Sequence, residues 1–93
     1  MPELLTSDEI QAGLGSLSGW TLKGKEIAKS YKFHDFKEAM RFVNAVAEEA
    51  EKLDHHPDIF VSYNRVTLTL STHSAGGLTE KDFSLARQIQ YRE

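Results

Sequence analysis

The chain has 93 residues, of which 40% are hydrophobic and 27% are charged. We expect a single domain spanning residues 1–93, because this length supports one small core. The net charge of −3 argues against a nucleic-acid-binding surface, no apolar run is long enough for a membrane span, and the lack of cysteine excludes disulfide and thiolate chemistry. The first residues lack a secretory signal pattern, so we expect a cytoplasmic protein.

Three helices are predicted, each opened by a capping pair. In such a pair the N-cap side chain and an acidic side chain three positions later bond each other's backbone. The pairs are Thr6/Glu9, Asp35/Glu38 and Thr79/Asp82. The first helix carries a short apolar stripe and ends before Gly19, while the second runs to about residue 53.

The middle helix, residues 36–53, has the most regular apolar spacing in the chain. Its expected buried stripe is Phe36, Ala39, Met40, Val43, Val46, Ala47, Ala50 and Leu53. The expected solvent face is Lys37, Arg41, Glu48, Glu49 and Lys52. Phe42 and Ala45 widen the apolar surface, which would suit a second contact such as another subunit.

Two β-hairpins are predicted, from residues 20–23 with 26–33, and from residues 58–63 with 65–72. Lys29 interrupts the apolar row of the first hairpin and suggests an exposed edge, and a turn is expected at Asn64-Arg65. In the last strand Val66, Leu68 and Leu70 face one way, and His73 falls by parity on the opposite face. The order α-β-β-α-β-β-α predicts a two-layer α+β fold with a four-stranded antiparallel sheet covered on one face by helices.

Two adjacent histidines, His55 and His56, lie where the middle helix must end, because Pro57 follows. The helix C-terminus and the carboxylates of Glu51 and Asp54 favour a protonated imidazole. We therefore expect these rings to exchange protons near neutral pH, as general acid–base catalysis requires. His34, by contrast, merely precedes a helix cap and needs no further role.

A zinc site is the competing interpretation of several histidines beside carboxylates. The absence of cysteine and of two histidines spaced four apart on a helix disfavours it, so no metal is expected. Helix capping accounts for Asp82 by itself. Trp20 and Tyr63 are more often core residues, although each could wall an aromatic substrate.

The pattern Glu51-x3-His55-His56-Pro57, followed by Tyr63, His73 and Asp82 at fixed spacings, resembles the signature of the pterin-4a-carbinolamine dehydratases. The neighbouring segments 70–73 and 77–79, Trp20 and the order of elements agree with that family as well, and the resemblance covers nearly the whole chain.

The resemblance implies removal of water from a 4a-hydroxytetrahydropterin, such as 4a-hydroxytetrahydrobiopterin, to give the quinonoid dihydropterin, a step that recycles the cofactor of aromatic amino acid hydroxylases. It implies no metal, no bound cofactor and a homodimer or homotetramer. The matching catalytic residues are His55, His56 and His73. Our hypothesis is that His55 and His73 form the acid–base pair and His56 orients substrate, although these roles could be permuted.

The remaining motif residues would support the three histidines. Glu51 would hold one imidazole in its productive tautomer, and backbone groups of Gly76 and Gly77 would bond the amide edge of the pterin. The supporting or substrate-binding set is Glu51, Asp54, Pro57, Trp20, Tyr63 and Asp82.

Two alternatives stay open at this stage. A non-catalytic interaction module would use the apolar face of residues 36–53 and would not bind pterin. An enzyme of the same fold could also serve another pathway, such as a molybdopterin-related or folate-related step.

Overall fold

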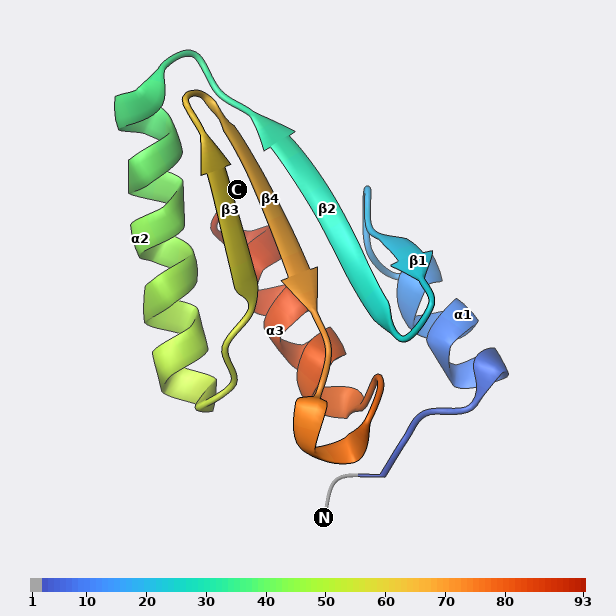
Figure 1. Ribbon diagram of the computed structural model, residues 1–93. Coiled ribbons are helices and arrows are strands. Elements are labelled where there is room, and N and C mark those ends of the chain that lie inside the picture. Colours follow the sequence, from blue (N-terminus) through green and yellow to red (C-terminus); the bar gives the residue numbers. More distant parts are fainter. Residues whose placement is uncertain (1–2) are drawn as a thin grey trace.

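The computed structural model describes residues 3–93 as a four-stranded antiparallel sheet combined with three α-helices (Figure 1). The elements are α1 (Ser7–Gly15), β1 (Thr21–Lys23), β2 (Glu26–Lys32), α2 (Phe36–Leu53), β3 (Asp58–Ser62), β4 (Arg65–Leu70), a 3-10 turn η1 (His73–Ala75) and α3 (Glu80–Tyr91). The predicted α+β class and the order α-β-β-α-β-β-α are confirmed. Within residues 3–93 no helix has both the length and the apolarity that a membrane crossing requires.

The strands lie in the order β1-β2-β4-β3, with α3 passing behind them in the view of Figure 1. Val66, Leu68 and Leu70 of β4 are completely buried and face the helices, as their alternation predicted. No helix within residues 3–93 covers the opposite face of the sheet, and Phe60 on that face is 64% exposed.

Local capping begins each helix as expected. Thr6 and Glu9 form a complete capping box at α1, and Thr79 and Asp82 form another at α3. At α2 only one bond of the predicted pair is present, in which the Asp35 side chain accepts from the backbone N–H of Glu38 at 2.9 Å.

The buried face of α2 is rotated from the predicted stripe. Phe42 is part of the core, whereas Phe36 is 50% exposed, Leu53 is 39% exposed and Ala47 also faces outward. Glu49, expected on the solvent face, is buried because Arg92 after α3 donates to its Oε2 at 2.5 Å. This hydrogen bond is the main reason that the pKa of Glu49 lies below its ordinary value, although burial opposes it.

Within residues 3–93, β2 pairs only with β4 beyond Ala28, so its other edge is open there as expected, but the Lys29 side chain itself is largely buried. Its ammonium lies on the inner face of β2, where it donates to the backbone O of Ser18 at 2.7 Å and to the Glu93 carboxylate at 2.8 Å. The phenol of Tyr31 donates to the same carboxylate at 2.5 Å. Burial, and then this carboxylate, raise the pKa of Tyr31 far above its ordinary value.

The turn between β3 and β4 is formed by Tyr63 and Asn64, one position earlier than predicted. Tyr63 takes the left-handed conformation at φ 51°, and its side chain is 66% exposed. Asn64 instead exchanges two hydrogen bonds with the backbone of Phe33, at 2.8 and 2.9 Å. Those contacts fix the hairpin against the end of β2 and leave the left-handed position to Tyr63.

Candidate active site

The adjacent histidines are placed by the way α2 ends. Asp54 takes the left-handed conformation (φ 49°, ψ 44°), which stops the helix after Leu53. The backbone N–H of His55 then bonds back to the carbonyl of Ala50 at 3.1 Å. This reversal separates the rings of His55 and His56 before the chain enters β3 at Asp58.

His73 reaches the site from a turn that follows β4, and not from the end of the strand itself. Strand β4 ends at Leu70, and Thr72 forms an isolated bridge with Gly77. The carbonyl of Thr72 accepts hydrogen bonds from the amides of Ala75, Gly76 and Gly77, which coils residues 73–75 into η1. We had expected backbone groups of Gly76 and Gly77 to bind the pterin. Their amide N–H groups already donate to the carbonyl of Thr72 and are therefore not free for that role.

The C-terminal end of α2 and the turn after β4 lie at the same end of the molecule (Figure 1). The structure brings His55, His56 and His73 together around one pocket of about 300 Å³. The pocket is lined mostly by polar side chains, and its other members are Asp54, Ser71, Thr72, Ser74 and Lys81. Three imidazoles, a carboxylate and an ammonium thus face a space large enough for a small polar heterocycle.

His55 is paired with a buried carboxylate. Its Nε2 lies 2.6 Å from Oδ1 of Asp82, and the two side chains are 11% and 0% exposed. The other oxygen of Asp82 accepts from the hydroxyl of Thr72 at 2.8 Å and from the backbone N–H of Thr79 at 2.9 Å. Asp82 therefore caps α3 as expected, but capping alone does not describe its role, because it also holds a histidine of the pocket.

His56 is paired with an exposed carboxylate. Its Nε2 lies 2.6 Å from Oε2 of Glu51, and the two side chains are 57% and 76% exposed. Solvent screens an ion pair of this kind, and both side chains can rotate away. The orientation of His56 is therefore less constrained than that of His55, whose carboxylate partner is locked by two further donors.

The remaining predicted residues divide into two groups. Asp54 lines the pocket, and Pro57 is half-buried just before β3 without lining it. Trp20 is a core residue with 6% exposure and lies outside the pocket lining, and its buried indole N–H has no hydrogen-bond partner within the described part of the chain. Tyr63 lies in the β3–β4 turn, at the end of β3 opposite the histidine pair, so the structure does not bring it to the pocket.

Four pocket residues were missed from the sequence: Ser71, Thr72, Ser74 and Lys81. Thr72 carried a usable signal, because it continues the inward row of β4 two positions after Leu70 with a polar side chain. Lys81 carried no comparable signal, since a lysine in the first turn of a helix is ordinarily a solvated residue.

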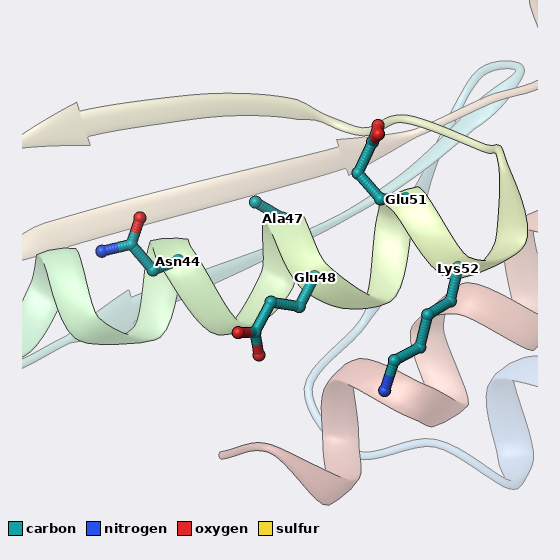
Figure 2. Close-up of a pocket in the computed structure, with 5 residues that line it drawn as sticks. All are labelled: Asn44, Ala47, Glu48, Glu51 and Lys52. Carbon is teal, nitrogen blue, oxygen red and sulfur yellow. The ribbon is translucent and has the colours of Figure 1, made fainter.

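A second depression, of about 760 Å³, follows the outer face of α2. Figure 2 shows its five lining side chains, which project from successive turns of that helix: Asn44, Ala47, Glu48, Glu51 and Lys52. Glu51 thus belongs to this groove and also pairs with His56 of the pocket. Among residues 3–93, no three histidine or carboxylate side chains are grouped closely enough to hold a metal ion.

The two-layer fold and the histidine-lined pocket define a small α+β protein of the pterin dehydratase type. The profile described as pterin 4 alpha carbinolamine dehydratase matches residues 3–91, and the chain belongs to that family.

Individual relatives agree with this assignment. A protein of Nostoc sp. (strain PCC 7120 / SAG 25.82 / UTEX 2576) is 54% identical over 89 residues, covering 96% of both chains, and one of Sulfurisphaera tokodaii is 48% identical over 85 residues, covering 91% of both. Both carry the provisional name pterin-4-alpha-carbinolamine dehydratase.

Two solved structures share the fold. A crystal structure from Brucella melitensis, described as a transcriptional coactivator/pterin dehydratase, is 46% identical with a TM-score of 0.90, covering 95% of this chain and 96% of that one. A pterin dehydratase-like protein described as a RuBisCO assembly factor in the alpha-carboxysome has a TM-score of 0.63 over 78% of this chain. At 22% identity, this second likeness concerns the fold alone.

Proposed function

We propose that the protein dehydrates a 4a-hydroxytetrahydropterin, such as 4a-hydroxytetrahydrobiopterin, to the quinonoid dihydropterin. The observation that carries this proposal is the convergence of His55, His56 and His73 on one polar pocket in a member of this family. The step would return the tetrahydropterin cofactor that aromatic amino acid hydroxylases consume.

The reaction needs one proton delivered and one removed. An acid protonates the hydroxyl on carbon 4a, and the C–O bond breaks with its electron pair leaving on water. The neighbouring ring nitrogen gives up its proton to a base, and the freed electron pair forms the new C=N double bond to carbon 4a. Acid and base catalysis by positioned side chains contributes roughly 10²–10⁴-fold each, and no redox partner is required.

His55 and His73 are proposed as the acid–base pair, with His56 binding and orienting the substrate. His55 suits proton transfer because its partner Asp82 is fully buried and fixes the ring. His73 is exposed on η1, where it can exchange protons with water between turnovers. Lys81, which lines the same pocket, would donate a hydrogen bond to a carbonyl oxygen of the pterin.

We also propose that the protein self-associates as a homodimer or homotetramer through the groove on α2. The groove residues recur at spacings of three and four, which is the spacing by which one helix packs against another. Phe36 and Leu53 add exposed apolar surface to this helix. A second copy packed here would also cover the Glu51–His56 pair and limit its motion.

Stopped-flow dehydration of a synthetic 4a-hydroxytetrahydropterin tests the proposed activity. Wild type should accelerate the reaction, and His73→Ala should reduce kcat by about 10²-fold or more. Because His73 is exposed, the same variant should unfold within a few degrees of wild type. His34→Ala is the matched control, since His34 is exposed and outside the pocket. Near-full activity of His73→Ala would refute its assignment, and activity that survives exhaustive chelation would argue against a metal-dependent reaction.

A further inference from the structure

A buried hydroxyl links the cap of α3 to the candidate catalytic histidine. Thr72, Thr79 and Asp82 are 3%, 1% and 0% exposed, so their polar atoms depend on one another for hydrogen bonds. The hydroxyls of Thr72 and Thr79 lie 2.8 Å apart, and that of Thr72 also lies 2.8 Å from Oδ2 of Asp82. The chain of contacts continues through Asp82 to Nε2 of His55 at 2.6 Å.

The numbers of available donors and acceptors determine which atom donates in each of these hydrogen bonds. Oδ2 of Asp82 faces the backbone N–H of Thr79 and the hydroxyl of Thr72, and a carboxylate only accepts. The hydroxyl of Thr72 therefore donates its single proton to Asp82. Thr79 must then donate its own proton to Thr72, which leaves the Thr79 oxygen to accept the backbone N–H of Lys81 at 3.3 Å.

The same comparison of donors and acceptors assigns the proton position on the His55 imidazole. With Asp82 ionised at the first turn of α3, Oδ1 is also an acceptor, so Nε2 of His55 carries the proton in their shared bond. The neutral ring then keeps its lone pair on Nδ1, the nitrogen that the carboxylate does not occupy. In this tautomer Nδ1 is the ring nitrogen that can accept a proton.

We propose that Thr72 is a positioning residue: its hydroxyl locks the Asp82 carboxylate and thereby holds His55 in the Nε2–H tautomer with Nδ1 free for the reaction. The kinetic part of this inference rests on the proposed dehydratase function. Helix capping does not require such a hydroxyl, because the box of Thr6 and Glu9 at α1 forms without a third donor. In α3 the extra donor instead restrains rotation of the carboxylate that faces His55.

Two variants and a control test the inference. Thr72→Val keeps the shape and removes the hydroxyl, whereas Thr72→Ser restores it. Thr69→Val is the matched control, because Thr69 lies on the same strand but on the uncovered face of the sheet. The first readout is the nitrogen-15 NMR signature of His55 in labelled protein, together with the resonance of its Nε2 proton. The second readout is kcat and KM for dehydration of 4a-hydroxytetrahydropterin.

Wild type should show the Nε2–H tautomer and a downfield Nε2 proton, as expected for a short hydrogen bond to a carboxylate. In Thr72→Val that proton should move upfield and broaden, and kcat should fall roughly 10- to 100-fold with little change in KM. Thr72→Ser should recover both readouts, and Thr69→Val should leave both unchanged. An Nδ1–H tautomer in wild type, or a Thr72→Val protein with an unaltered resonance or unaltered kcat, would overturn the inference. If wild type proved to lack dehydratase activity, the proposed function would fail, and the NMR readout would still decide the role of Thr72 because it needs no substrate.

Discussion

Replacing Asp82 by Asn changes the hydrogen bonding of His55 with little change in side-chain volume. The amide has nearly the volume of the carboxylate but exchanges one acceptor oxygen for an NH₂ donor. The oxygen can keep its bonds from Thr72 and from the backbone of Thr79, and the NH₂ group then faces Nε2 of His55. To accept that bond, His55 must move its proton to Nδ1, which is the wrong tautomer for a base.

The substitution should reduce both the stability of the protein and kcat, by amounts that can be estimated separately. Losing a charge-assisted buried contact should cost about 1–3 kcal/mol of unfolding free energy, or about 4–8 °C in Tm for each kcal/mol in a domain of this size. Losing a correctly oriented acid–base group should reduce kcat by about 10²–10⁴-fold. At roughly 1.36 kcal/mol for each factor of ten, the catalytic loss is about 2.7–5.4 kcal/mol, a range centred well above that of the stability loss.

Stopped-flow dehydration and thermal unfolding followed by circular dichroism measure the two effects on the same Asp82→Asn preparation. Asp58→Asn is the control, because Asp58 is an exposed carboxylate at the start of β3, outside the pocket. A folded Asp82→Asn protein with kcat within threefold of wild type would refute the reasoning, since His55 would then work in either tautomer.

Three further predictions address binding, acid stability and assembly. Lys81→Met should raise KM about tenfold with kcat little changed, because the ammonium would bind the ground state and the transition state alike. Steady-state kinetics measure this effect, with Lys37→Met as the control. An unchanged KM would show that Lys81 does not bind the substrate. Hydrogen bonding from Arg92 lowers the pKa of Glu49, so its ionised form stabilises the folded state above the ordinary value of 4.5, and this contribution is lost as pH falls through the lowered pKa of the folded state. The Tm difference between wild type and Glu49→Gln should therefore be largest near neutral pH and shrink on acidification, and a difference that grows in acid would contradict the assignment. Ala47→Glu should dissociate the assembly in sedimentation experiments while leaving Tm nearly unchanged, because Ala47 is exposed on α2; an assembly that persists would show that the contact lies elsewhere.

Much of the fold could be predicted because its signals are local. The capping boxes at Thr6 and Thr79 each involve residues three apart, so the sequence alone identifies where α1 and α3 begin. The alternation of Val66, Leu68 and Leu70 likewise identifies the inner face of β4 without knowledge of its neighbours. The histidine pair before Pro57 marked the end of α2, and the motif spacing pointed to the family.

Contacts between distant segments could not be predicted in the same way. Lys29 looked like an exposed interruption until Glu93, 64 residues later, was found beside it. Glu49 looked solvated until Arg92 reached it from beyond α3. In each case the local pattern recorded only the polarity of a side chain, and polarity gives no indication of which distant group will satisfy it.

The candidate site likewise combines features set by local sequence with contacts between distant segments. The sequence by itself determined which residue types were available, where the helices begin, and that His55 and His56 lie at a helix end. Only the tertiary structure assigned Asp82 to His55 and Glu51 to His56, and only it placed Thr72 and Lys81 at the pocket. The physical reason is that capping and alternation are decided over a few residues, whereas His55 and Asp82, 27 positions apart, are brought together only by burial of the shared core.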